Sequence, residues 1–371
     1  MKPPVQRIAV GTGVHSAEWL VSTRAGQALL AASHGTDHRP RCMCQLGGIE
    51  MYVGRRGHVY YLARMLGTGF LHAERCESVE DGKLFSGAFA YAPGAIIEEP
   101  NGILSLSANL GRMDRQPPPP TAVSIDGVLD FLVEQADINR VNAGDEPNSW
   151  ASVRDRMMEA ATFIKLGGAN LASHLYLPER YSRERGAEIL AECESLLKTG
   201  GEYTLICAPL KEIRATTYGW QVVLKHLPGL RLWASKEAAQ AMERRLRTSC
   251  FNNPPTYALC LVAAKPGQRE GNYSINNMAC LTTNSRFLPC RTERQAEVAD
   301  SLIKDGRSTL LRPLRFDCAP VLALADFAIL GDDTPEPIFV LSPSGDDDLD
   351  AAKRSMANLM QRNRAKVMVF D

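Results

Sequence analysis

Arg41-Cys42-Met43-Cys44 and His72-Ala73-Glu74-Arg75-Cys76 enclose the stretch of sequence on which the interpretation of this chain depends. The two runs supply three thiols and one imidazole, which is the number and type of ligands in a closed structural zinc site. Thiolates and imidazole suit zinc where thiols stay reduced. The alternative is three unrelated buried cysteines and a surface histidine, and Cys-x-Cys is a less common spacing than Cys-x-x-Cys. We expect one structural zinc ion bound by Cys42, Cys44, His72 and Cys76.

The sequence between the two runs predicts a β-hairpin. Residues 49–53 and 59–62 are rich in residues that favour strands, and Gly54-Arg55-Arg56-Gly57 between them indicates the turn. A hairpin brings its ends together, so it would unite the two pairs of ligands. Four protein ligands leave no position for water on the metal, so we expect the ion to be structural and not catalytic.

Composition limits the functions that the chain can have. Its 42 basic residues balance its 42 acidic residues, so nucleic-acid binding would have to come from local clusters. No apolar run approaches the roughly 20 residues that span a bilayer, and the first residues lack a signal peptide. We therefore expect a cytoplasmic protein with no membrane partner, whose ten cysteines are reduced.

At 371 residues the chain exceeds one typical domain. Pro117 to Pro120 mark the clearest boundary, because four prolines favour a stiff, extended spacer. Residues 1–115, apart from a helical stretch at 16–32, predict a β-rich zinc-binding domain. Residues 121–200 have a helical period and predict a small helical domain, for which a winged-helix-like arrangement and a plain bundle are both open. Residues 201–285 predict strands with one helix.

The last predicted domain covers residues 286–371 and has the order helix, strand, strand, strand, helix, strand. Thr292 and Gln295 form a capping box for its first helix. This order resembles the core of the restriction-endonuclease-like PD-(D/E)xK nucleases. The predicted fold is thus α+β and multidomain, with a zinc-binding β-rich unit, a helical middle and an α/β restriction-endonuclease-like C-terminal domain.

The nuclease resemblance implies where a catalytic site would lie. Asp326 stands where that family has its aspartate, and Glu293 or Glu297 would supply the helical acid. The next strand, Ile338 to Ser342, has neither the acidic residue nor the lysine of the pattern. Because hydrolysis of a phosphodiester needs several carboxylates around Mg²⁺, the resemblance implies an inactive site. A Mg²⁺-dependent nuclease that uses Asp326 and Glu297 is the alternative.

The chain as a whole resembles the bacterial domain-of-unknown-function 1173 family, nearly from end to end. Leu66 stands where that family is expected to have a proline, which affects only the shape of a loop. The resemblance implies a bacterial protein carried on plasmids and integrative elements, and it implies no activity. The matching segments, besides the cysteines and His72, are Arg39 to Arg41, Met51 to Val53, Leu62 to Met65, Gly67 to Gly69, Lys211 to Ile213, Val223 to Pro228 and Arg312 to Asp317.

We expect a zinc-stabilised, DNA-binding accessory protein of a mobile element, because basic residues cluster locally. The clusters are Arg55 and Arg56; Arg244, Arg245 and Arg247; and Arg354, Arg362, Arg364 and Lys366. Glu243 and Asp346 to Asp348 lie nearby, so solvated, charge-balanced faces are the alternative.

Two other candidates stay open. A scaffold that binds other proteins of a mobile-element or defence assembly could use Trp150, Trp220 and Trp233 as interface anchors. His226 is a further candidate for chemistry, although a structural histidine explains it as well.

Overall fold

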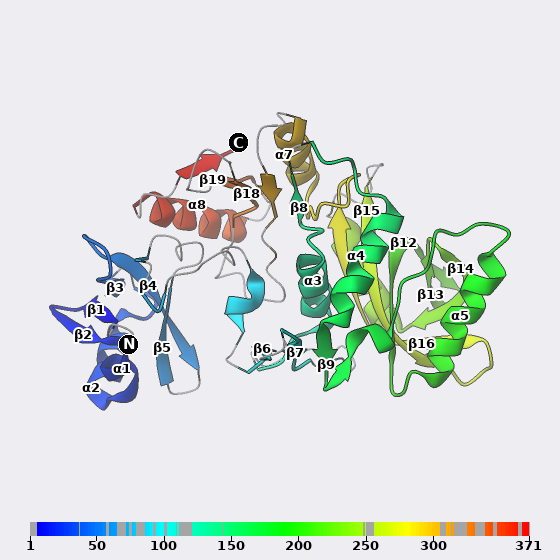
Figure 1. Cartoon of the computed structure of the whole chain (residues 1–371), viewed down its shortest axis with the longest axis horizontal. Coiled ribbons are helices and arrows are strands. Elements are labelled where there is room, and N and C mark those ends of the chain that lie inside the picture. Colours follow the sequence, from blue (N-terminus) through cyan, green and yellow to red (C-terminus); the bar gives the residue numbers. More distant parts are fainter. Residues whose placement is uncertain are drawn as a thin grey trace.

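The computed structural model shows a mixed α+β protein (Figure 1). It describes residues 6–36, 38–56, 59–64, 72–73, 76–78, 86–91, 94–99, 102–108, 110, 121–142, 144–247, 249, 256–304, 309–312, 314, 325–330, 338–343, 347–362 and 366–370. In this part of the chain, no helix is long and apolar enough to cross a membrane. Pro117 to Pro120, the predicted linker, lie outside these residues.

The N-terminal unit is a five-stranded antiparallel sheet with two helices (Figure 1). Its strand order is β2-β1-β3-β4-β5, and the strands are β1 (Arg7–Val10), β2 (Gly13–Ser16), β3 (Arg41–Cys42), β4 (Ile49–Arg56) and β5 (Val59–Arg64). The predicted helix over 16–32 is divided into α1 (Ala17–Ser22) and α2 (Arg24–Ser33), because extended Thr23 ends the first and caps the second.

The predicted hairpin is present as β4 and β5, with Arg56 opposite Val59. The glycines around Arg55 and Arg56 had suggested that these two residues form the turn. In the structure, both belong to strand β4. The core of the unit is small. Its large buried side chains are Ile8, Val10, Leu20, Leu30, Met51 and Val53, together with Cys42 and Cys76.

A second sheet and two helices follow. The sheet has the order β10-β9-β7-β6, built from β6 (Ile96–Glu98), β7 (Leu104–Leu106), β9 (Ile164–Leu166) and β10 (Ala169–Asn170). Short 3₁₀ turns lie at Gly87–Ala90 and Leu171–Ser173. The helices are α3 (Ile125–Gln135) and α4 (Trp150–Thr162), capped by the side chains of Ser124 and Ser149.

The largest sheet contains β11 (Leu175–Tyr176), β12 (Thr204–Thr216), β13 (Gly219–Leu224), β14 (Leu227–Ala234), β15 (Tyr257–Pro266) and β16 (Asn272–Thr283). Pairing runs from β12 through β13, β14, β16 and β15 and returns to β12, so these five strands form a closed barrel. The β14–β16 pair is parallel and the other four are antiparallel.

Two helices accompany the barrel. The first is α5 (Gly186–Thr199), and the second, α6 (Lys236–Arg247), joins β14 to β15. One hydrophobic core includes residues of α3, α4, α5 and the barrel strands. The helices α3, α4 and α5 therefore pack directly on the barrel (Figure 1).

The C-terminal unit has the predicted order of elements: α7 (Glu293–Lys304), β17 (Thr309–Leu311), β18 (Phe327–Leu330), β19 (Ile338–Leu341), α8 (Asp347–Arg362) and β20 (Lys366–Val369). The sheet order is β20-β19-β18-β17-β8. Its last strand, β8 (Arg140–Val141), comes from the middle of the chain, and this pairing was not predicted. Asn139 adds a hydrogen bond to the carbonyl of Arg312.

Candidate metal centre

Strand pairing in the N-terminal sheet brings the first two predicted ligands into position. Cys42 lies on β3, opposite Ile8 of β1 and Ile49 of β4. Cys44 follows in the connection to β4. That connection contains Gly47 and Gly48 at φ values of +86° and +70°, in the left-handed region that glycine adopts without strain. The chain can therefore turn back within a few residues and leave Cys44 beside Cys42.

All four predicted ligands converge. One ligand atom from each of Cys42, Cys44, His72 and Cys76 lies within 4.8 Å of the others. The Sγ atoms of Cys42 and Cys76 are 3.6 Å apart, and Nδ1 of His72 lies 3.3 Å from Sγ of Cys44 and 3.5 Å from Sγ of Cys76. No described cysteine forms a disulfide.

These spacings fit a tetrahedral zinc ion. Zn–S bonds of about 2.3 Å at tetrahedral angles separate two sulfurs by about 3.8 Å, and a Zn–N bond of about 2.0 Å separates sulfur from nitrogen by about 3.5 Å. The observed separations lie within a few tenths of an ångström of both values. The cluster can hold a metal ion such as zinc, with His72 bound through Nδ1.

A second layer of donors faces the sulfurs. The side-chain amide of Gln6 lies 3.5 Å from Sγ of Cys42 and 3.8 Å from Sγ of Cys76, and it also donates to Ser78. The backbone N–H of Ser78 donates to Sγ of Cys76 at 3.4 Å. N–H groups that point at sulfur favour the thiolate form, which is the form that binds a metal. Sequence reasoning missed Gln6 and Ser78, because neither is a ligand type.

Without a bound cation, burial in this site disfavours the charged forms of the cysteine thiols and of the histidine imidazole. Burial raises the pKa of Cys42 to about 12 and lowers the pKa of His72 to about 4. Burial also raises the pKa of Cys44. Nε2 of His72 is buried and has no hydrogen-bond partner among the described residues. Neutral imidazole is the form that binds zinc, and a divalent cation compensates the thiolates that burial opposes.

Comparison with known proteins places the chain in a family. A family model described as a protein of unknown function (DUF1173) matches residues 16–369. The chain belongs to the DUF1173 family. No curated protein and no solved structure matches the chain. The match includes all four clustered ligands but not Gln6, which precedes it.

In this DUF1173 protein, Asp326 is buried and fully engaged. Its carboxylate accepts hydrogen bonds from Lys353 at 2.8 and 3.0 Å, from Gln295 at 2.7 Å, and from the backbone N–H of Ser342 at 2.7 Å. The guanidinium of Arg312 lies beside it as well. Among the described residues, those that contact this carboxylate are hydrogen-bond donors, so Asp326 has a structural position.

The predicted helical acids do not join Asp326 in a metal-binding group within the described part of the chain. Glu293 and Glu297 are exposed on α7, and Glu297 pairs with Arg294. The α7 residue that reaches Asp326 is Gln295, which also receives the N–H of Arg291. Lys353 was missed, although its spacing of four residues from Leu349 and Ala357 puts a lysine on the apolar stripe of α8.

The arginines of the predicted basic clusters differ in whether their side chains are already bonded within the protein. Arg245 forms an ion pair with Asp126 of α3, and the guanidinium of Arg244 donates to the carbonyl of Gln240. Arg247 ends α6, and Arg354 is exposed on α8. The side chains of Arg55, Arg56 and Arg362, and all of Arg364, lie outside the described residues.

His226 occupies a structural position. Its ring stacks on Trp150 with centroids 5.6 Å apart, and Nδ1 accepts the backbone N–H of Tyr181 at 3.4 Å. Burial lowers its pKa to about 4. Trp150 is buried and donates to the carbonyl of Pro178. Trp150 is thus a core residue, and His226 is packed against it.

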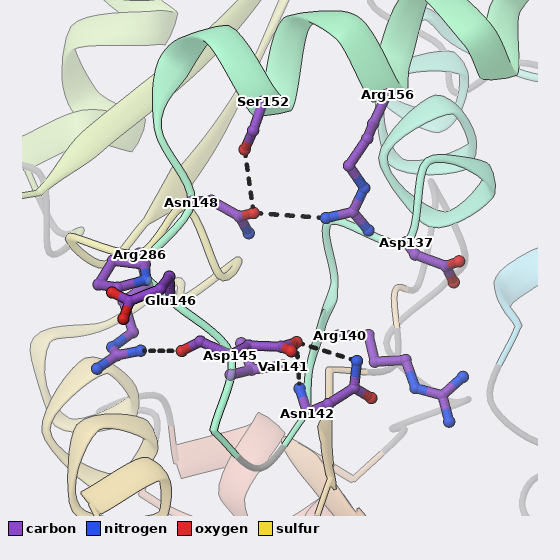
Figure 2. Close-up of a pocket in the computed structure, with 11 residues that line it drawn as sticks. Asp137, Arg140, Val141, Asn142, Asp145, Glu146, Asn148, Ser152, Arg156 and Arg286 are labelled. Carbon is purple, nitrogen blue, oxygen red and sulfur yellow. Dashed lines mark hydrogen bonds between the residues drawn. The ribbon is translucent and has the colours of Figure 1, made fainter.

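A polar cavity of about 410 Å³ lies between α4 and the segment that follows β8 (Figure 2). Its polar groups bond mainly to one another: Arg156 and Ser152 to Asn148, Asn142 to Asp145, and Arg286 to the carbonyl of Asp145. Figure 2 shows Arg140 and Arg286 on opposite sides of the cavity. The groups do not converge on one point where a ligand would be bound.

Proposed function

We propose that this chain is a zinc-stabilised, DNA-binding accessory protein of a bacterial mobile element, without catalytic activity. The observation that carries the proposal is the topology of the barrel. Numbered from β12, its strands pair in the order 1-2-3-5-4 and close on strand 1, with strands 3 and 5 parallel. The helix α6 lies between strands 3 and 4.

This is the strand order of the OB-fold, a five-stranded Greek-key barrel that binds oligonucleotides and oligosaccharides. A fold does not by itself select a ligand, so the choice of DNA depends on the side chains of the barrel. Exposed Lys and Arg occupy its strands and turns, including Arg214, Arg231, Lys265 and Arg269. Cations favour phosphates over neutral sugars.

The metal centre supports the zinc-stabilised part of this proposal, because its position in the fold is structural. Cys42 and Cys76 belong to the small N-terminal core, so a zinc ion would link β3 to the segment after β5. Four protein ligands close the coordination shell. Zinc therefore contributes stability and no reaction.

The C-terminal unit supports an accessory role without catalysis. Its order of elements and its parallel β19–β20 pair are those expected of a nuclease-like core. Asp326, however, is surrounded by Lys353, Gln295, Ser342 and Arg312 in place of carboxylates. A divalent cation would have to displace a buried lysine to reach it.

The test is binding of the zinc-loaded full chain to fluorescein-labelled single- and double-stranded oligonucleotides at low salt, followed by incubation with Mg²⁺. The proposal predicts a rise in anisotropy and intact oligonucleotide. Absence of binding would reject it. Cleavage that is lost in Asp326→Ala would favour a nuclease, and no binding combined with a stoichiometric co-purified protein would favour a scaffold.

A further inference from the structure

One continuous row of side chains crosses the outside of the barrel. Direct cross-strand pairing joins Lys265 to Ser274, Ser274 to Trp233, Trp233 to Gln221 and Gln221 to Arg214. Residues directly opposite one another share a face of the sheet. The row therefore runs over β15, β16, β14, β13 and β12 in that order.

The neighbouring row identifies which face this is. Val222, Leu232 and Tyr273 are also paired with one another across β13, β14 and β16, and they are 0–2% exposed. Successive residues of a strand point to opposite faces. The row that contains Trp233 thus lies on the opposite face, with exposed Lys265 and Arg214 at its two ends and with Gln221, which Arg214 contacts, buried at 8% exposure.

Trp233 lies in the middle of this row and is held in one orientation. Its Nε1–H donates to the side chain of Asn272 at 2.9 Å, and its ring lies over Gly219 of β13. The indole N–H is satisfied and the side chain is only partly buried. A fixed aromatic ring on the outside of a sheet can serve as a platform on which a base stacks.

A second aromatic ring and four cations surround Trp233. Tyr218, in the β12–β13 turn, is 85% exposed. Arg214 is positioned by two hydrogen bonds to Gln221. Arg231 is exposed on β14, and Arg269 in the β15–β16 turn. Only Glu212, which pairs with Arg214, and Glu270 oppose the cations on these segments.

We propose that this face, defined by Tyr218, Arg214, Gln221, Trp233, Arg231 and Lys265, binds a single strand of DNA, with bases stacked on Trp233 and Tyr218 and phosphates on the flanking cations. The proposal rests on the proposed function and names its ligand. The strand must be unpaired, because stacked rings need free base faces. Five strands spaced by about 4.8 Å give a row about 19 Å long, which suits the shorter sites of such barrels, about four nucleotides upward.

The experiment measures affinity of the zinc-loaded full chain for labelled dT20, rU20 and a 20-bp duplex. The variants are Trp233→Leu, Tyr218→Ala and Lys265→Ala. The matched controls are Phe163→Ala, another exposed aromatic residue, and Lys304→Ala, an exposed lysine at the end of α7. Circular dichroism and the melting temperature show whether each variant is folded.

We expect dT20 to bind more tightly than the duplex, and Trp233→Leu and Tyr218→Ala each to weaken it about 5- to 150-fold. The controls should leave its affinity unchanged. If Trp233→Leu fails to fold, Tyr218→Ala and Lys265→Ala decide, because both residues are exposed.

Four results would overturn this inference. If wild-type protein binds no nucleic acid, the proposed function fails with it. If dT20 binds but the three variants bind like the controls, DNA binds at another surface. The proposed function then stands, and the proposed binding face is rejected. Preference for the duplex would reject the unpaired strand, and preference for rU20 would reject DNA.

Discussion

Substitution of Cys44 by serine should unfold the N-terminal unit. Cys44 is only partly buried, whereas Cys42 is completely buried, so Cys44→Ser removes a ligand with little loss of packing. Sγ of Cys44 lies 3.3 Å from Nδ1 of His72, and the ligand atoms of all four residues lie within 4.8 Å. A serine hydroxyl is a poor ligand for zinc beside thiolates.

The expected effect is large. A structural zinc ion contributes about 10–16 kcal/mol of apparent binding energy, whereas an entire domain has a stability of about 5–15 kcal/mol. Among the described residues, the core cluster of this unit has six large buried aliphatic or methionine side chains. The free energy lost with the zinc ion is therefore larger than the stability that packing alone gives this unit.

The assay combines zinc analysis of the purified protein with thermal denaturation. Wild-type protein should contain one zinc ion per chain, and Cys44→Ser should lose it together with the first melting transition. Cys193→Ser is the matched control, because Cys193 is buried on α5 within a different core. A Cys44→Ser protein with unchanged zinc content and melting would refute the reasoning, as would equal zinc loss in Cys193→Ser.

Three further changes test other parts of the structure. Burial lowers the pKa of His226 from 6.5 to about 4, so the unfolded chain binds more protons between these pH values and stability falls as pH decreases through them. His226→Gln should reduce this loss at pH 5 by about 1 kcal/mol, since His226 is partly exposed and solvent screens part of the effect, as measured by urea denaturation at pH 5 and 7; an unchanged pH profile would contradict this. Lys353→Met removes one of the two cations beside the buried Asp326 and should cost about 3–5 kcal/mol, and a urea midpoint equal to that of wild type would contradict the buried pair. Trp150→Phe leaves the carbonyl of Pro178 without its indole donor and should cost about 1–3 kcal/mol in the same assay, whereas a neutral effect would place water at that carbonyl.

The metal ligands could be predicted from sequence because few residue types bind zinc. Cys42, Cys44, His72 and Cys76 were expected to converge, and they do. The C-terminal order of helices and strands was also correct, since each element has a strong local period. Local signals therefore sufficed for these features.

Features that depend on distant pairing could not be predicted. Closure of the barrel depends on the three-residue parallel contact between β14 and β16 and on β12 pairing with β15. The Arg140–Val141 strand joins a sheet whose other strands begin at Thr309. Lys353 reaches Asp326 only because α8 packs across β18 and β19. In each case the partner is chosen by tertiary packing, which local propensity does not encode.

The most direct measurement is the affinity of the zinc-loaded full chain for single-stranded DNA as a function of salt concentration. The proposed face and the adjoining β15–β16 turn together carry four cations, Arg214, Arg231, Lys265 and Arg269. At about 0.7 counterions released per neutralised phosphate, log K should fall with log salt at a slope of about −3. Affinity would then drop about 50-fold between 50 and 200 mM salt, and Lys265→Ala should reduce the slope by about 0.7. Binding that does not change with salt, or no binding at 50 mM, would contradict the account.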